Sequence, residues 1–310
     1  MARQIVIGTR GSRLALWQAN FVAEAIKSKN RGYGVSLKKI KTTGDKILDS
    51  PLAKIGDKGL FVKEIEHVLA RGEVDLAVHS MKDLPTDIPA DLTIAAVTKR
   101  EDPFDALISR EGTRLKDLRP GAVIGTSSLR RRAQLLAYRP DLTFVDLRGN
   151  VDTRVRKMYE QNLDAIILSG VGLIRLGWGD RITERISYDV MVPGVGQGAI
   201  AIEARRDDQE ILELASLLND STTERAVLAE RALLRRLEGG CQVPLGALAV
   251  IEDHKLVLEA AVASVDGSEL IRDSMEGEPE QPEELGIRLA EKLLERGADI
   301  ILEEIRKGTV

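Results

Sequence analysis

The sequence predicts an α/β protein with two similar halves, followed by a smaller α+β unit. Short apolar strand patterns alternate with helical patterns over the first two thirds of the chain, which is typical of α/β folds. Residues 6–9 (Val-Ile-Gly-Thr) recur unchanged as residues 123–126, and a helical pattern follows each copy. After residue 222 the pattern changes to a long helix followed by alternating strands.

The first half begins with a buried strand at residues 5–7. Ser12 can cap the helix that follows, whose apolar residues recur at helical spacing as far as Ile26. We expect strands at residues 35–40 and 75–79 and a helix at residues 61–70. Residues 42–60 are rich in Gly, Lys and Asp, and a loop of this length is usually a lid, a binding loop or disorder.

The second half repeats the scheme. Strands are predicted at residues 122–124, 142–145 and 164–168, and helices at 129–137 and 151–161. With one gap, Ser12 and Gln18 match Ser128 and Gln134, and the spacing from residue 75 to 80 recurs from 164 to 169. Ligands of open α/β sheets bind at the carboxyl ends of strands, against helix N-termini. We therefore expect two halves that face each other across a cleft lined with anion-binding groups.

The remaining elements complete a three-domain plan. Residues 193–199 are predicted to be a crossover or hinge, and residues 199–204 a strand that returns to the first half. The C-terminal unit is predicted as a helix at 222–237, strands within 246–273 with a hairpin at Asp266-Gly267, and a helix at 285–294 before a short apolar tail. The predicted domains are 1–99 with 194–220, then 100–193, then 221–310.

Composition narrows the possible classes of function. The chain has 310 residues, 43% of them hydrophobic and 30% charged, which excludes a disordered or collagen-like protein. Its net charge of −4 gives no indication of nucleic-acid binding. Cys241 is the only cysteine, so no intrachain disulfide forms. The start has no signal core and no run approaches eighteen apolar residues, so we expect a cytoplasmic protein without a membrane span.

The charge is concentrated in particular regions. Residues 105–193 carry 15 basic residues, 13 of them Arg, against 11 acidic ones, whereas residues 222–310 carry 11 against 19. Arginine presents a rigid fork that binds carboxylate or phosphate through two hydrogen bonds. A solvated face explains scattered arginines, but it explains Arg130-Arg131-Arg132 less well, because these three follow a helix-start signal.

Several common motifs are absent from the sequence. The glycines at 194–198 lack the strand and helix of a dinucleotide loop, and no Gly-Lys pair exists for a phosphate-binding loop. The three histidines, His67, His79 and His254, lie far apart, so no metal site is predicted. A Ser-His-Asp triad stays open, although no Gly-x-Ser-x-Gly elbow occurs.

Two local features point to chemistry. Cys241 lies in a Gly-Gly-Cys-Gln loop, where it is either a small packing residue or an attachment point, and the local context does not decide between them. Lys82 and Asp83 directly follow a buried strand, where they form either a surface ion pair or part of a site. We favour the site, because a carboxylate there can stabilise a developing cation or move a proton.

Taken together, the ordered segments resemble the porphobilinogen deaminase family. The matching segments are TRGSRLALWQ (9–18), PLAKIGDKGLF (51–61), HSMKDLP (79–85), GTSSLRR (125–131), LRGNV (147–151), VGQGA (195–199) and LEGGCQVPLG (237–246). They occur in family order over nearly the whole chain. The sequence departs from the family at Arg13, where proline is common, and at 169–171, where small alanines are usual.

The resemblance implies a fold, a cofactor and a reaction. The first two domains would have the topology of periplasmic binding proteins, with a cleft between them, and the third would carry Cys241. A dipyrromethane cofactor would be joined to Cys241 through a thioether. The enzyme would link four porphobilinogen molecules head to tail, release ammonia at each step and hydrolyse off hydroxymethylbilane, in tetrapyrrole and heme biosynthesis.

The resemblance also assigns roles to individual residues. Asp83 would be catalytic and would stabilise the cationic azafulvene formed as ammonia leaves. The cofactor would be held by Lys82, Asp83, Thr126, Ser128, Arg130, Arg131 and Arg148. The substrate or growing product would be held by Arg10, Ser12, Gln18, Arg148, Arg154 and Arg175. Lys54, Lys58 and Phe61 would belong to a mobile lid over the cleft.

The same residues leave a second interpretation open. A two-lobed protein that binds small carboxylates without catalysis would use the same fold and an arginine-lined cleft. That interpretation gives no reason for Cys241 in a glycine loop, so we favour the enzyme. By resemblance we further expect a monomer, no nucleic-acid partner and a transient hand-off of product to the next tetrapyrrole enzyme.

Overall fold

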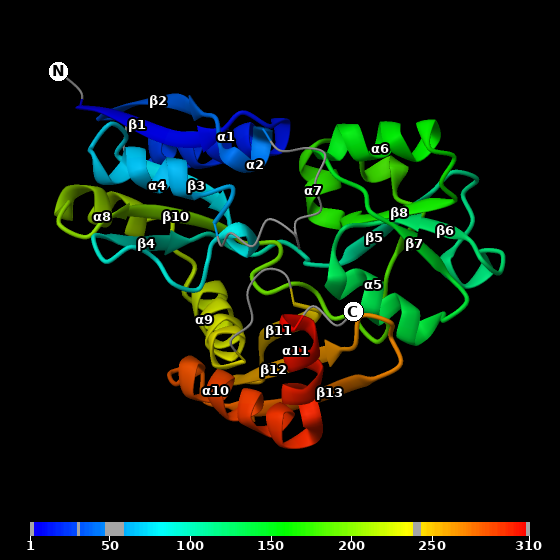
Figure 1. The fold of residues 1–310 in the computed structure, drawn as a ribbon. Coiled ribbons are helices and arrows are strands. Elements are labelled where there is room, and N and C mark those ends of the chain that lie inside the picture. The colour runs from blue at the N-terminus through cyan, green and yellow to red at the C-terminus, as the bar shows by residue number, and fades with distance from the viewer. Residues whose placement is uncertain (1–2, 30–31, 47–58, 238–242, 308–310) are drawn as a thin grey trace. The chain divides into compact units, whose positions relative to one another are not determined.

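The computed structural model describes residues 3–29, 32–46, 59–237 and 243–307 (Figure 1). The chain divides into two compact units. The first unit comprises residues 1–48, 57–101 and 198–224, and the second comprises residues 49–56, 102–197 and 225–310.

The first unit is built on a five-stranded sheet in the order β2-β1-β3-β10-β4. Its strands are β1 (Arg3–Arg10), β2 (Tyr33–Ile40), β3 (Leu76–Ser80), β4 (Leu92–Val97) and β10 (Ile200–Arg205). β2 and β3 are parallel to β1, whereas β10 is antiparallel to both of its neighbours. The predicted return strand is confirmed, because β10 enters this sheet between β3 and β4.

Helices cover both faces of the first sheet. α1 (Arg13–Lys29) and α8 (Gln209–Ser216) bury Val22, Ile26 and Leu214 in one core, and α4 (Lys63–Ala70) buries Ile65 and Leu69 in another. The predicted loop at 42–60 begins instead with the short helix α2 (Thr43–Lys46), and residues 47–58 lie outside the described residues.

The second unit contains a sheet of the same plan, in the order β7-β6-β8-β5-β9. Its strands are β5 (Asp105–Ser109), β6 (Val123–Gly125), β7 (Thr143–Val145), β8 (Ala165–Ser169) and β9 (Glu184–Arg185). α5 (Leu129–Tyr138) packs on one face, and α6 (Val151–Glu160) and α7 (Gly170–Arg175) pack on the other. Five elements, each eight residues long or shorter, were not predicted from the sequence: β4, β5, β9, α7 and α8.

Backbone hydrogen bonds confirm the internal repeat. In the first unit Asp75 Oδ2 accepts from Val6 N at 2.8 Å, and in the second Asp164 Oδ2 accepts from Val123 N at 2.7 Å. The two helix starts match as well, since Ser12 Oγ accepts from Ala15 N at 3.2 Å and Ser128 Oγ accepts from Arg131 N at 3.4 Å. These matches align residue 12 with 128, and residue 80 with 169.

The C-terminal part of the second unit is a separate layer of sheet and helices. β11 (Leu245–Glu252), β12 (Lys255–Ala263) and β13 (Leu270–Gly277) form an antiparallel sheet, and the predicted hairpin joins β12 to β13. α9 (Ser221–Arg236), α10 (Pro282–Leu293) and α11 (Asp299–Arg306) share its core. The predicted apolar tail is thus a helix, which begins after Gly297 breaks the preceding one with a φ of 97°.

Candidate functional site

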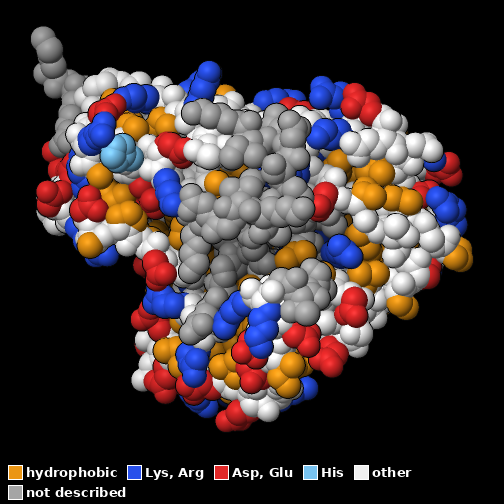
Figure 2. Space-filling view, viewed as in Figure 1, with side chains coloured by type: hydrophobic (Ala, Val, Ile, Leu, Met, Phe, Trp, Pro, Cys, Tyr) orange, Lys and Arg blue, Asp and Glu red, His pale blue; other side chains and the backbone are white. Residues whose placement is uncertain are grey.

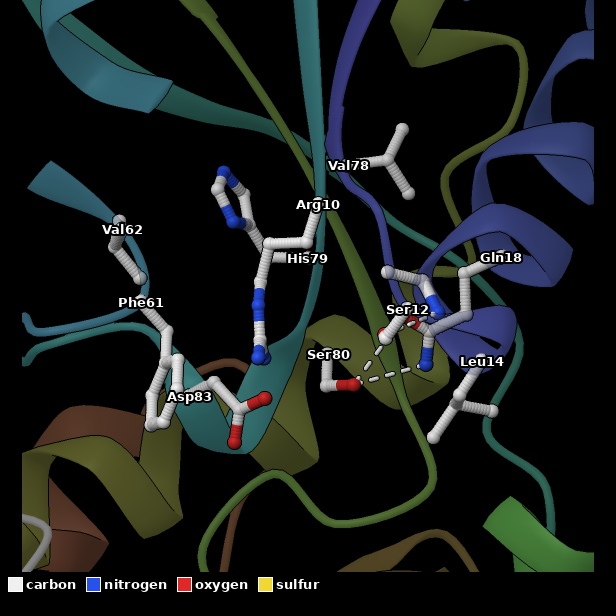
Figure 3. Close-up of a pocket in the computed structure, with 11 residues that line it drawn as sticks. Arg10, Ser12, Leu14, Gln18, Phe61, Val62, Val78, His79, Ser80 and Asp83 are labelled. Atoms are coloured by element: carbon white, nitrogen blue, oxygen red, sulfur yellow. Dashed lines mark hydrogen bonds between the residues drawn. The ribbon is translucent and has the colours of Figure 1, made fainter. Parts of the chain in front are cut away.

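A pocket in the first unit gathers several of the predicted site residues. It opens where β1 and β3 end, between the N-terminus of α1 and the residues just before α4 (Figure 3). Its lining includes the predicted residues Arg10, Ser12, Gln18, Phe61 and Asp83. The remaining lining residues are Leu14, Ala15, Val62, Val78, His79 and Ser80. The local sequence creates this pocket, because turns replace regular structure at both strand ends.

Arg10 is held by two contacts within the first unit. Its Nη2 donates to Asp45 Oδ1 at 2.5 Å, and its guanidinium carbon lies 4.1 Å from the centre of the Phe61 ring. Burial by itself raises the pKa of Asp45, but the hydrogen bonds and charge of Arg10, together with Thr42, outweigh it and hold that pKa below its usual value. Arg10 is therefore a charged and oriented group at the edge of the pocket.

Gln18 and Ser80 form a polar wall on the other side of the pocket. Gln18 Nε2 lies 2.8 Å from Ser80 Oγ, and that hydroxyl lies 3.2 Å from Gln18 Oε1 (Figure 3). Gln18 is buried on α1, and Ser80 is the last residue of β3. This pair fixes the strand end from which Asp83 follows.

Asp83 lies in a tight turn directly after β3. Residues Met81–Asp83 form one turn of 3₁₀ helix, and Met81 N donates to Ala199 O at 3.0 Å. The side chains of Met81 and Leu84 are buried, whereas Lys82 and Asp83 are half-buried. The turn therefore anchors its apolar residues in the core and directs Asp83 into the pocket (Figure 3).

A buried acidic cluster lies beside this pocket. His79 Nε2 on β3 is 3.2 Å from Glu203 Oε2 on β10, and Glu66 on α4 belongs to the same group. Both Glu203 oxygens lack a hydrogen-bond donor among the described residues. Burial, followed by the charge of Glu203, raises the pKa of Glu66 to about 7. We call Glu66, His79 and Glu203 the acidic cluster.

The second unit places a different set of charges at the equivalent helix start. Ser128 caps α5, and Thr126 Oγ1 accepts from Ser128 N at 3.2 Å. These bonds fix the loop after β6 and with it the first turn of α5. Arg130 and Arg131 follow in that turn and are each only 6% exposed.

Arg130 and Arg131 converge on Asp105, the first residue of β5. Arg130 Nη1 donates to Asp105 Oδ2 at 2.7 Å, and Arg131 Nε donates to Oδ1 at 2.9 Å. Gln197 Nε2 donates to Oδ1 at 3.1 Å. Burial opposes ionisation of Asp105, but the two guanidinium groups outweigh burial and hold its pKa far below the usual range. We call Asp105, Arg130 and Arg131 the arginine cluster.

Three further predicted arginines belong to the second unit. Arg148 and Arg175 are buried, at 9% and 6% exposure, and Arg175 ends α7. Arg154 lies on α6, where its Nε donates to Gly149 O at 2.8 Å. All three make additional polar contacts, so none is a free cation.

The structure thus brings the predicted residues together within each unit. Arg10, Ser12, Gln18, Phe61 and Asp83 share one pocket, and Thr126, Ser128, Arg130 and Arg131 share one helix start. Cys241, Lys54 and Lys58 lie outside the described residues.

Sequence reasoning missed four acidic partners, namely Asp45, Glu66, Asp105 and Glu203. For Asp105 and Glu203 a signal existed, because each is an acid at the start of, or within, a strand whose other residues are mostly apolar.

Other classes of site receive no support from the described residues. No group of three or more His, Cys, Asp or Glu side chains among them could hold a metal ion. None of the helices searched in the described ranges is long and apolar enough to cross a membrane. On the face drawn in Figure 2, basic and acidic side chains are interspersed.

Comparisons with known proteins give a family for the whole chain. Residues 5–213 match the family model described as porphobilinogen deaminase, dipyromethane cofactor binding domain, and residues 224–295 match porphobilinogen deaminase, C-terminal domain.

Curated relatives of similar sequence belong to the same family as the family models. The porphobilinogen deaminase of Desulforudis audaxviator is 56% identical over 99% of this chain and 100% of that protein. The porphobilinogen deaminase of Pelotomaculum thermopropionicum is 54% identical over 99% of this chain and 98% of that protein.

Solved structures are similar only at a low level. A YaeC-family lipoprotein from Enterococcus faecalis covers 70% of this chain and 92% of that one, with a TM-score of 0.44 and 14% identity. The predicted α/β fold class is confirmed by the strand orders above, which give two sheets of one plan and a smaller α+β part. On the family models and the full-length relatives together, the chain belongs to the porphobilinogen deaminase family.

Proposed function

We propose that this protein is an enzyme that links four porphobilinogen molecules head to tail on a dipyrromethane primer and releases hydroxymethylbilane. In each cycle a substrate carbon–nitrogen bond breaks, the amine leaves as ammonia, and a carbon–carbon bond forms to the next pyrrole, which loses a proton. Water ends the series by hydrolysis. The observation that carries the proposal is the pocket of the first unit, which joins a fixed cation and a carboxylate in a chain of this family.

Asp83 has the chemistry required for the leaving step. When ammonia departs, positive charge develops on the substrate ring, and a carboxylate directed into the pocket stabilises it. Arg10, on the same pocket, would pair with an acidic side chain of the substrate, with Ser12 and Gln18 as neutral hydrogen-bonding groups. Asp45 and Phe61 support this role, because they restrict the orientations that Arg10 can adopt.

The second unit has the donor set that a polycarboxylate cofactor needs. Two hydroxyl oxygens near this helix start, Ser127 Oγ and Ser169 Oγ, are buried and lack a hydrogen-bond partner among the described residues. Arg130 and Arg131 bring two positive charges against the single negative charge of Asp105. Such a site fits an acidic group. When bound, the dipyrromethane supplies the pyrrole end to which the first substrate is joined.

The family membership supports further proposed roles. Lys82, Thr126, Ser128 and Arg148 would help to hold the cofactor, with Cys241 as its thioether anchor. Arg148, Arg154 and Arg175 would hold carboxylates of the growing chain. Lys54, Lys58 and Phe61 would belong to a lid over the site.

Organisation and location are part of the same proposal. The three domains would be 1–99 with 194–220, then 100–193, then 221–310. We propose a monomer and a cytoplasmic location, the latter in agreement with the single cysteine. We also propose a transient hand-off of product to the next tetrapyrrole enzyme.

Intact mass spectrometry of the purified protein tests the function directly. The wild-type chain should carry a mass excess equal to two deaminated porphobilinogen units, and a Cys241→Ser variant should carry none. An unmodified wild-type chain is then incubated with porphobilinogen, because the enzyme would build its own primer. A protein that stays unmodified and releases no ammonia would be a carboxylate-binding protein, and the proposal would be wrong.

A further inference from the structure

Within the arginine cluster, the guanidinium group of Arg131 has more hydrogen-bond partners than that of Arg130. Arg131 uses all three guanidinium nitrogens. Nε and Nη2 contact Asp105 Oδ1 at 2.9 and 2.8 Å, and Nη1 donates to Ile167 O at 3.2 Å. Arg130 uses Nη1 alone, which donates to Asp105 Oδ2 at 2.7 Å and to Val192 O at 2.9 Å. Among the described residues, the Nε–Nη2 edge of Arg130 has no partner.

The first unit shows that this fold does not require the cluster. Residue 12 aligns with 128 and residue 80 with 169, so Arg130 and Arg131 occupy the positions of Leu14 and Ala15. Asp105 is paired with Ser169 in the sheet just as Ile200 is paired with Ser80, so Asp105 occupies the position of Ile200. An apolar set therefore fills the same positions of the same plan. A buried ionic set rarely adds stability over an apolar one, which indicates a role in binding.

The charges and donors of the cluster define what it can accept. Two guanidinium groups against one carboxylate leave one net positive charge in a buried site. The free edge of Arg130 presents two parallel N–H donors, which is the geometry that a single carboxylate accepts. Ser169, which pairs with Asp105 in the sheet, adds a hydroxyl that has no hydrogen-bond partner within the described part of the chain.

We propose that Asp105 is a positioning residue that limits this site to one carboxylate group. Asp105 fixes the orientation of Arg131 and neutralises the charge of Arg131. Asp105 also orients Arg130, so that the Nε–Nη2 edge of Arg130 binds one carboxylate of the dipyrromethane. The inference rests on the proposed function for the identity of that ligand. Without Asp105, the site would have two positive charges and would attract an additional small anion.

The first experiment compares Asp105→Asn with wild type. Asparagine has almost the same shape as aspartate and keeps one acceptor oxygen, so the far-UV circular dichroism should stay unchanged. The fraction of chains with the covalent mass excess should fall about tenfold, because Arg130 loses its fixed orientation. Inorganic phosphate should raise the Tm of the variant by roughly 2–4 °C and leave wild type almost unchanged. Asp141→Asn, which alters an exposed Asp–Arg pair of the same unit, is the matched control.

A second variant keeps the proposal testable if Asp105→Asn fails to fold. The triple variant D105I/R130L/R131A installs the residues of the first unit at the equivalent positions. It should fold, lose any response to phosphate and carry no mass excess. A triple variant that does not fold would show that the cluster is structural, and the proposal would be overturned.

The outcomes separate this inference from the proposed function. If wild type itself never acquires the mass excess, the proposed function fails. If wild type is loaded and Asp105→Asn is loaded equally well, with no response to phosphate, then Asp105 does not position the arginines and the inference alone is wrong.

Discussion

The two α/β units share one plan but place buried charge on opposite faces of their sheets. In the second unit Asp105, Arg130 and Arg131 lie on the face covered by α5. The matching positions of the first unit are apolar. In the first unit the acidic cluster lies on the face covered by α4. In the second unit, Leu168 occupies the position of His79 and Ile108 that of Glu203. The common fold therefore does not dictate where charge is buried.

The two clusters also differ in how well their charges are compensated. Every oxygen of Asp105 accepts a hydrogen bond from an arginine, so the arginine cluster is paired and carries net positive charge. The acidic cluster has two carboxyl groups against one histidine, and both oxygens of Glu203 lack donors among the described residues. The first arrangement suits an anionic ligand. In the second, burial and the charge of Glu203 raise the pKa of Glu66, so this carboxyl binds a proton more readily than an exposed one.

The largest effect is expected from breaking the arginine cluster. Arg131→Met leaves Asp105 with one arginine in a dry site, so the free energy of unfolding should fall by about 3–5 kcal/mol. Urea denaturation followed by circular dichroism measures this change. Arg132→Met, which alters the exposed neighbour on the same helix, should have little effect. Equal, small losses in both variants would mean that the cluster is not energetically coupled.

A large loss of activity is expected at the strand end of the first unit. Residues 80 and 169 align, so Asp83 has Gly172 as its counterpart, and only the first unit offers a carboxylate there. Asp83→Asn should keep the fold and the mass excess, while turnover falls by about 10²–10³. Release of ammonia from porphobilinogen gives the rate, with the exposed Asp87→Asn as control. Wild-type turnover in Asp83→Asn would refute the catalytic role.

Smaller losses of stability, similar in the two units, are expected at the helix caps that both units share. Ser12 and Ser128 cap equivalent helices through the same bond to the residue three positions later. Ser12→Ala and Ser128→Ala should each lower the free energy of unfolding by about 1 kcal/mol. Thermal unfolding of the two variants side by side tests the equivalence, and a loss confined to one of them would contradict it.

The smallest effect is a pH dependence of the acidic cluster. The pKa of Glu66 is raised to about 7 from 4.5, so the folded state binds more protons than the unfolded state between these values. Stability should therefore fall as pH rises from 4.5 to about 7 and then level off, by no more than about 1 kcal/mol after screening by water. The Tm of wild type, measured from pH 5 to 8, should show this slope, and Glu66→Gln should reduce it. An unchanged slope in that variant would assign it to other groups.

Local patterns in the sequence predicted much of the fold and part of the site. The strand at 5–7, the capped helix starts at Ser12 and Ser128 and the repeat of Asp75 and Asp164 follow from periodicity and capping chemistry, which act within a few residues. Family motifs then indicated Arg10, Asp83, Arg130 and Arg131. Elements such as β5 and α7, which are five and six residues long, were not predicted from the sequence, and tertiary contacts stabilise them.

The sequence by itself determined the fold class of each half, the family of the chain and which residues carry charge. It did not determine their partners, because pairing across a sheet depends on strand order. β5 and β10 each insert antiparallel beside a strand far away in the chain, which brings Asp105 to Arg130 and Arg131 and brings Glu203 to His79. Only the tertiary structure decided that one arginine is fully engaged and the other keeps a free edge, since hydrogen-bond geometry exists only once the two strands are in register.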